Sequence, residues 1–156
     1  MDVTIRRATL DDAHRLALLL QDIGWFEAFK GGNIDESSAR TSARLQQCFA
    51  DASHSVYLAE TTGGETAGYG SVHWLPYLFM AGPEGYVSEL FVSEIARGQG
   101  VGRKLLDAIA TEARARGCTR LSLINLRNRE SYQRQFYIKA GWQERGEAAN
   151  FVLQLS

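Results

Sequence analysis

Three glycines at alternate positions, Gly98, Gly100 and Gly102, constrain the fold of this chain more than any other feature. They follow an apolar segment that ends at Val92, and they open a stretch with the apolar periodicity of a helix, residues 100–116. Glycine adopts backbone conformations closed to other residues, and it has no side chain to keep a ligand away. The first amides of the helix lack partners within it and lie at the positive end of its dipole. This strand, turn and helix therefore predict a cradle for an anion such as a pyrophosphate.

The spacing of these glycines excludes two common nucleotide-binding motifs. A dinucleotide-binding fingerprint requires G-x-G-x-x-G after a first strand, whereas this chain has G-x-G-x-G far from its start. A Walker A loop requires Ser or Thr after its lysine, but Leu105 follows Lys104. Neither motif explains the loop.

A different family fits the spacing. The pattern Arg97-x-x-Gly100-x-Gly102, with Leu90 and Val92 upstream, resembles the acyl-CoA loop of the GNAT N-acetyltransferase superfamily. The opening segment, residues 5–13, looks like the start of that superfamily. The segment Phe136 to Trp142 resembles its late helix, in which a Tyr stands four residues before a Gly-aromatic pair. The resemblance covers nearly the whole chain.

Composition agrees with a small globular enzyme. The 156 residues suit a single domain, 1–156, and 45% hydrophobic with 22% charged residues is ordinary for a folded protein. A net charge of −1 argues against a nucleic-acid partner. The chain has no signal-peptide core and no apolar run long enough to span a membrane, so we expect a cytoplasmic protein. Cys48 and Cys118 lack metal-ligand spacing, and we expect buried free thiols and no metal site.

The order of elements predicts a mixed α/β (α+β) fold. A hairpin is expected at Gly63-Gly64, and glycines end the two later helices. Thr9 and Asp12 form a capping box ahead of the first helix. Strands are expected at 3–7, 55–60, 66–74, 85–92 and 119–126, with a terminal pair at 142–145 and 151–155; helices are expected up to 23 and at 35–50, 100–116 and 130–140.

The resemblance implies a mixed, mostly antiparallel sheet that splays between its fourth and fifth strands, with acetyl-CoA in the gap as co-substrate. Strand amides exposed there can pair with the amide-containing pantetheine arm. Arg103 and Lys104 face either the phosphates or solvent. The superfamily usually has an Asn about seven residues before the late Tyr; position 130 is Glu here, which leaves Asn128 or Asn125 as the contact. The implied cofactor-binding residues are Leu90, Phe91, Val92, Arg97, Gly98, Gln99, Gly100, Val101, Gly102 and Asn128.

Two residues are candidates for the chemistry. A primary amine is mostly protonated at neutral pH and needs a base before it can attack the thioester. Glu89 lies within an otherwise apolar strand and is our candidate base, directly or through a water; a structural ion pair is the alternative. Tyr137 is the candidate acid for the departing thiolate. Neither cysteine falls in the segments that line the predicted gap, so we expect direct transfer in a ternary complex.

The acceptor side is less defined. His73 lies near a strand end and either faces the acceptor pocket or is a solvated histidine. Aromatic residues that could form an acceptor wall, or simply pack in the core, are Trp25, Phe26, Phe29, Trp74, Tyr77 and Phe79.

Two readings of the whole chain follow. The first is an acetyltransferase that acts on a small-molecule or peptide amine, with a homodimer as a family-level expectation. The second is a catalytically silent acyl-CoA-binding sensor or interaction module, in which Glu89 and Tyr137 would have no purpose. A longer acyl group or an oxygen acceptor also fits the sequence.

Overall fold

The computed structural model describes residues 1–156, whose contacts divide the chain into two units, Met1–Ile124 and Asn125–Ser156. The first unit contains a five-stranded sheet in the order β1-β2-β3-β4-β5. Neighbouring strands are antiparallel except β4 and β5, which are parallel, so the predicted mixed, mostly antiparallel sheet is confirmed. The strands are β1 Val3–Arg7, β2 His54–Thr61, β3 Thr66–Leu75, β4 Glu84–Val92 and β5 Arg120–Leu123.

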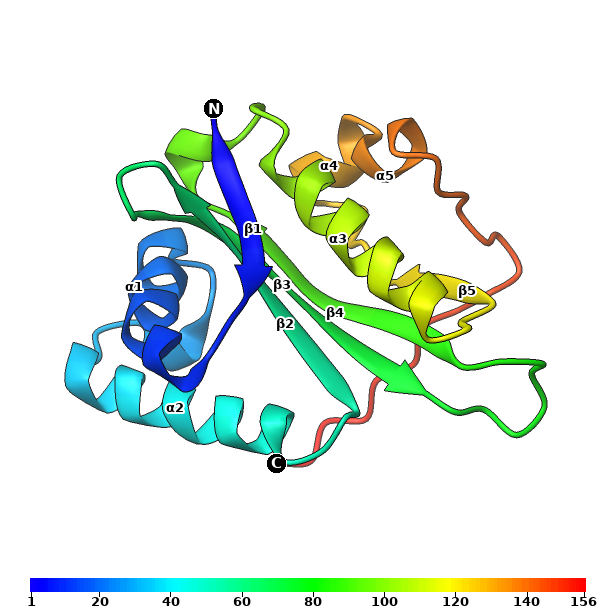
Figure 1. Cartoon of the computed structure of the whole chain (residues 1–156), viewed down its shortest axis with the longest axis horizontal. Helices are drawn as coiled ribbons and strands as arrows, with labels where there is room; N and C mark the ends of the chain where they lie inside the picture. Colours follow the sequence, from blue (N-terminus) through cyan, green and yellow to red (C-terminus); the bar gives the residue numbers. More distant parts are fainter. The chain divides into compact units, whose positions relative to one another are not determined.

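Helices cover both faces of this sheet (Figure 1). The helix α1 (Ala13–Ile23) packs against α2 (Ile34–Phe49) over one face, and α3 (Val101–Ala115) lies along the other. The predicted capping box is present, because the Thr9 amide donates to Asp12 Oδ2 at 2.7 Å. No helix is long and apolar enough to cross a membrane. The helices of the unit are α1 Ala13–Ile23, α2 Ile34–Phe49 and α3 Val101–Ala115, with short 3-10 turns at Leu10–Asp12, Glu27–Phe29 and Glu94–Ala96.

Two apolar clusters lie on opposite faces because side chains alternate along each strand. Leu58 and Tyr69 belong to the cluster beneath α1 and α2. Ala59, the neighbour of Leu58, belongs to the cluster beneath α3 together with Leu105. Gly70 of β3 lets α3 approach, since a Cβ there would stand 3.1 Å from Ile109 Cδ1.

The parallel strands β4 and β5 pair over only part of their length. Glu84 to Val87 lie opposite Arg120 to Leu123, and the pairing stops there. The rest of β4, Ser88 to Val92, still pairs with β3 on its other side. The sheet therefore parts between its fourth and fifth strands, as predicted. The predicted strand 119–126 is shorter than expected, ending at Leu123.

A buried carboxylate fastens α3 to the sheet. Glu112 accepts hydrogen bonds from Tyr57 Oη at 2.7 Å and Ser55 Oγ at 3.0 Å. Its Oε2 also lies 2.7 Å from Arg7 Nη2 and 2.8 Å from Arg116 Nε. Burial pushes the pKa of Glu112 up, but the hydrogen bonds and the positive charges outweigh burial and lower it below its usual range.

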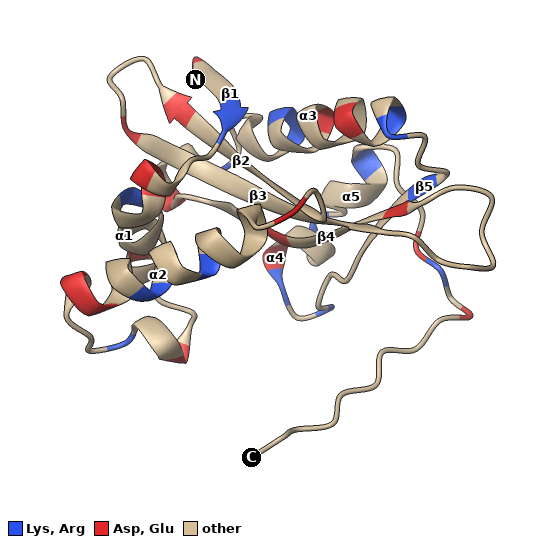
Figure 2. Cartoon of the chain, turned by 60° about the horizontal axis from the view of Figure 1, so that its bottom comes forward, with Lys and Arg blue, Asp and Glu red and all other residues tan.

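The second unit departs from expectation at both of its predicted elements. The predicted helix 130–140 is two short helices, α4 Glu130–Gln133 and α5 Phe136–Lys139, because Gln135 adopts a left-handed φ of 58° between them. The predicted strand pair at 142–145 and 151–155 was wrong: neither segment is a strand. The last residues run as an extended segment (Figure 2), in which Phe151 is 92% exposed. An alternating apolar pattern makes a strand only where a partner edge supplies hydrogen bonds.

Replacing Glu112 tests what holds α3. We expect Glu112→Gln to lower the free energy of unfolding at neutral pH by about 2 kcal/mol, because Arg7 and Arg116 lose their shared carboxylate. The pKa of Glu112 is lowered in the folded state, so its contribution is complete above the unfolded pKa of roughly 4.3 and is lost as pH falls through the lower folded value. Urea unfolding at several pH values should show the two proteins converging in acid.

The matched control is Asp107→Asn, which removes the exposed partner of Arg103 on the same helix. We expect a change below about 0.5 kcal/mol for this pair. An equal loss in both variants, or none in Glu112→Gln, would contradict the anchoring role.

Candidate functional site

The loop before α3 presents a run of free amides. The first helical hydrogen bond of α3 runs from the Lys104 amide to the Gly100 carbonyl at 3.1 Å. The amides of residues 98–103 donate to no backbone carbonyl. Gly98 and Gly100 have φ values of 74° and 82°, and a Cβ at either would meet no heavy atom within 4 Å. Free N–H groups at the start of a 15-residue helix fit a pyrophosphate.

Two charged residues around this loop already contact other groups of the protein. Arg97 donates from Nε to the Val92 carbonyl at 3.3 Å, and its guanidinium lies over the Trp25 ring at 5.2 Å. Arg103 pairs with Asp107 at 3.2 Å in an exposed contact. Along α3 the acidic Asp107 and Glu112 lie between basic residues near its two ends, so the helix carries both signs of charge (Figure 2). The loop amides, rather than a cluster of lysines, are the main attraction for an anion.

The free edge of β4 leads directly to that loop. Leu90, Phe91 and Val92 pair with β3 on one side, while β5 has ended on the other. Their side chains are used in packing: Leu90 and Val92 contact the cluster beneath α3, and Phe91 contacts the cluster beneath α1 and α2. On the β5 side their backbone has no strand partner; the Val92 carbonyl there accepts from Arg97 Nε, and the rest of this edge can pair with an amide-containing ligand.

The carboxylate of Glu89 lies on the face of the sheet that α1 and α2 cover. It is half-buried, and its Oε1 accepts a hydrogen bond from the Tyr69 phenol at 2.9 Å. Burial and the negative charge of Glu89 raise the pKa of Tyr69, so the phenol stays protonated and keeps donating. Within Met1–Ile124, no salt bridge joins Glu89 to an arginine or lysine.

Part of the expected aromatic wall forms beside Glu89. The Phe26 and Phe91 ring centroids are 4.9 Å apart, and Trp25 is 6.2 Å from Phe91. Trp74 does not join them. It is buried on the opposite face, where its Nε1 donates to Ser55 Oγ at 3.0 Å and Arg116 lies over its ring.

The other expected wall residues also lie elsewhere. Phe29 packs under Arg40, 5.1 Å from the guanidinium to the ring centroid. Tyr77 and Phe79 pair with each other at 5.5 Å in an exposed loop.

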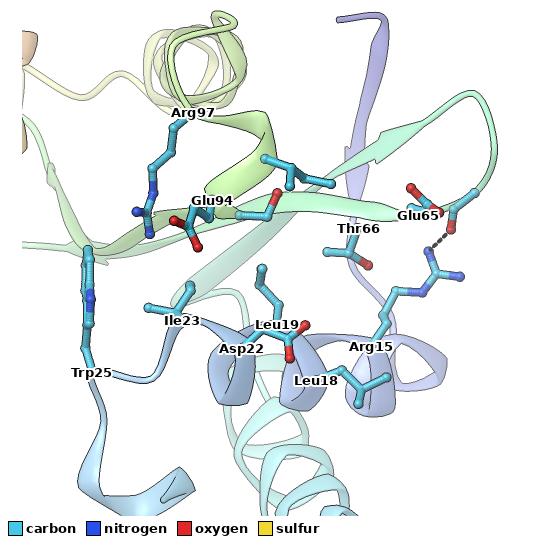
Figure 3. A pocket seen from close by; sticks show the side chains of 13 residues that line it. Arg15, Leu18, Leu19, Asp22, Ile23, Trp25, Glu65, Thr66, Glu94 and Arg97 are labelled. Atoms are coloured by element: carbon cyan, nitrogen blue, oxygen red, sulfur yellow. Dashed lines mark hydrogen bonds between the residues drawn. The ribbon is translucent and has the colours of Figure 1, made fainter.

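A cavity of about 770 Å³ lies between α1, the β2–β3 turn and the segment after β4 (Figure 3). Arg97 and Trp25 face each other at one end of it, and Arg15 lies at the other. Arg15 is neutralised by Glu60, 2.7 Å away. Three carboxylates also line the cavity, those of Asp22, Glu65 and Glu94. The cavity therefore favours a cationic or hydroxyl-rich ligand over an anionic one.

The candidate acid and the candidate Asn belong to the second unit. Tyr137 packs its ring between Phe136 at 4.9 Å and Trp142 at 6.0 Å. Burial raises the pKa of Tyr137 to about 12, which keeps the phenol protonated at neutral pH. Asn128 lies exposed in a turn, whereas Asn125 donates from Nδ2 to Ser131 Oγ at 2.9 Å. Of the two, Asn128 has the free amide group.

Both cysteines are free, and they are half-buried rather than fully buried as expected. Burial raises the pKa of each thiol, which makes the thiolate scarce at neutral pH. Neither thiol is therefore prepared for nucleophilic attack.

Two residues near Glu89 were missed at the sequence level. Tyr69 stands between Gly68 and Gly70 in a strand, which signals a large side chain set among small neighbours. Ser88 gave no signal, because a serine in a strand is unremarkable until its neighbours are known.

Comparison with known proteins agrees with this geometry. The Acetyltransferase (GNAT) family matches residues 20–142. An aminoglycoside N(6')-acetyltransferase type 1 of Stenotrophomonas maltophilia is 34% identical over 123 residues, which cover 76% of this chain and 72% of that protein.

Solved structures share the fold. A protein described as a transcriptional regulator, from Bacillus halodurans, superposes with a TM-score of 0.81 at 24% identity, covering 97% of this chain and 100% of its own. An aminoglycoside acetyltransferase from an uncultured soil metagenomic sample, in complex with sisomicin, gives a TM-score of 0.77 at 18% identity, covering 99% of this chain and 97% of its own. On the family match and the 34% identical relative, this chain belongs to the GNAT family of acetyltransferases, which transfer the acetyl group of acetyl-CoA to an amine.

Proposed function

We propose that residues 1–156 act as one catalytic domain that acetylates a primary amine of a small cationic molecule, with acetyl-CoA as co-substrate. The observation that carries the proposal is the open edge of β4, which continues into the free amides of residues 98–103. The residues proposed to hold the co-substrate are Leu90, Phe91 and Val92 through their backbone, Arg97, Gly98, Gln99, Gly100, Val101 and Gly102 at the phosphates, and Asn128.

In this proposal Glu89 takes a proton from the acceptor ammonium, directly or through a water. The Tyr69 phenol holds one oxygen of its carboxylate, which leaves the other oxygen for the acceptor. The freed amine forms the amide C–N bond while the thioester C–S bond breaks. Tyr137 protonates the departing sulfur. Direct transfer agrees with the raised thiol pKa values of Cys48 and Cys118, which make each thiolate, the form a covalent acyl-enzyme would need, scarce at neutral pH.

The proposed acceptor class is an aminoglycoside or a similar polyamine. The 34% identical relative is an aminoglycoside N(6')-acetyltransferase. The carboxylates of Asp22, Glu65 and Glu94 along the 770 Å³ cavity suit a ligand with several ammonium groups. The aromatic rings around Phe91 would pack against a sugar face.

A thiol-release screen with acetyl-CoA tests the function directly. Sisomicin and other aminoglycosides, linear polyamines, amino acids, arylamines and peptides serve as acceptors. We expect turnover with aminoglycosides or polyamines and little with arylamines. Tight binding of CoA without turnover of any amine would instead support the silent binding module.

Gly100 tests the anion cradle. We expect Gly100→Val to lower CoA affinity at least about 10-fold, because valine resists a φ of 82° and its side chain would fill the open space before the helix. The control is Gly117→Val at the other end of α3, where φ is 75° and the space is equally open. Calorimetric titration with CoA measures the affinity of both folded variants. Equal loss in both variants, or none in Gly100→Val, would rule out the cradle.

Glu89 tests the base. We expect Glu89→Gln to reduce kcat at neutral pH by about 10²–10⁴-fold, while the amide still accepts the Tyr69 hydrogen bond and CoA affinity is retained. Glu36→Gln, at an exposed position near the start of α2, should keep full activity. A wild-type rate and pH profile in Glu89→Gln would place the base elsewhere.

Tyr137 tests the acid. We expect Tyr137→Phe to lower kcat about 10²-fold or more with little change in KM, because the ring remains and only the proton donor is lost. With its pKa raised to about 12, the phenol stays protonated through neutral and mildly alkaline pH, so the deficit should be constant there. Tyr132→Phe, which removes a phenol that donates to Glu144 at 3.0 Å, is the control. Equal losses in the two variants would argue against a specific acid.

A further inference from the structure

A bulge interrupts β4 at the point where β5 leaves it. Along the β3–β4 pair, Ser71 lies opposite Glu89, but its neighbour Val72 lies opposite Val87. Ser88 is thus an extra residue with no partner in β3, and it directly follows the last β4 residue that pairs with β5. Bulges re-aim side chains and are frequent beside active sites.

This bulge turns two consecutive polar side chains to one face. In a regular strand Ser88 and Glu89 would point to opposite sides. Here Glu89 accepts from Tyr69, while Ser88 Oγ lies 2.8 Å from His73 Nε2. Tyr69 and His73 are four residues apart in β3 and therefore share a face. The Ser88 hydroxyl is exposed, so a ligand at the open edge can reach it.

His73 is arranged as a neutral imidazole. Its ring centroid lies 4.1 Å from that of His54, and Ser53 Oγ lies 2.8 Å from His54 Nδ1. Desolvation and the charge of His54 lower the pKa of His73. At neutral pH, with its proton on Nδ1, the ring accepts the Ser88 proton at Nε2. The titratable groups that face His73 are His54 from β2 and Tyr86 from β4.

Acetylation of an ammonium group removes two protons from its nitrogen. One must leave before the nitrogen can attack, and the second leaves as the amide forms. In sum one proton replaces the acyl group on sulfur, and one is released to solvent. In the proposed mechanism Glu89 takes the first nitrogen proton and Tyr137 supplies the proton of the thiol. The second nitrogen proton still needs an acceptor.

We propose that Ser88 and His73 form this second proton acceptor, an inference that rests on the proposed function. As the C–N bond forms and the C–S bond breaks, Ser88 Oγ takes the second of the two departing nitrogen protons and gives its own to His73 Nε2, which leaves one N–H on the product amide. The imidazolium and the protonated Glu89 then return their protons to solvent, and Tyr137, having protonated the sulfur, takes one proton back from solvent, so one proton is released in sum. Ser88 touches the substrate, and His73 acts through Ser88.

The test is the pH dependence of kcat/KM, measured with acetyl-CoA and sisomicin or the best amine of the screen. Wild type should lose activity in acid as pH falls through the pKa of His73, which lies below its usual value of about 6.5. His73→Gln keeps a hydrogen-bonding group but cannot titrate. We expect it to lower kcat/KM at neutral pH about 10²-fold and to abolish this acid limb. Ser88→Ala should do the same.

Two other histidines serve as controls, His54 beside His73 and His14 away from it. We expect His54→Gln to move the acid limb to higher pH with an unchanged plateau, because the charge that lowers the pKa of His73 is gone. A purely structural role for His73 would not produce that shift. His14 also forms a hydrogen bond with a serine, since its Nδ1 lies 2.8 Å from Ser38 Oγ, but this pair joins α1 to α2. We expect His14→Gln to have the kcat/KM and the pH profile of wild type.

The possible outcomes distinguish failure of the second proton acceptor from failure of the proposed acetyltransferase activity. Wild-type kcat/KM and acid limb in His73→Gln would overturn the second acceptor and leave the acetyltransferase intact. Failure of the wild type to turn over any amine would overturn both. CoA affinity and thermal midpoint establish that each variant is folded. If His73→Gln does not fold, the same measurement on Ser88→Ala tests the inference, since Ser88 is exposed and its replacement leaves the core intact.

Discussion

The end of strand pairing after Val87 is the constraint on which the rest of this structure depends. Up to Val87, β4 is held by neighbours on both sides; beyond it, one backbone edge is open. An unpaired buried edge is costly in a folded protein, so it is retained where a ligand completes it. The same few residues carry the Ser88 bulge and the Glu89 carboxylate. The open edge of β4 and the two polar side chains thus arise from one interruption of the sheet.

The loop after β4 is useful only if α3 is held in place. Leu105 and Ile109 are fully buried against the sheet, and each contributes roughly 1.5–3 kcal/mol by leaving water. At the far end, Glu112 joins the helix to β1 and β2 through Arg7, Ser55 and Tyr57. Apolar packing and the hydrogen-bonded ion pairs of Glu112 together fix the direction in which the free amides point.

Much of this could be predicted from sequence, because the decisive signals are local. The alternating glycines specify the loop before α3, and the apolar segment ahead of them specifies β4. The elements that sequence missed depend on distant partners. Phe151 to Leu155 alternate like a strand but form no strand in the structure. Ser88 and His73 meet only because of a bulge, which changes which residues share a face.

The central claim is that the open edge of β4 and the loop before α3 form one binding surface for the acetyl donor. Amide-resolved NMR during titration with CoA tests it most directly, because the claim concerns backbone N–H groups. The account predicts that the largest shifts fall in residues 88–92 and 98–103 together, with the last turns of α3 unaffected. Shifts confined to other parts of the chain, or to only one of these two segments, would contradict it.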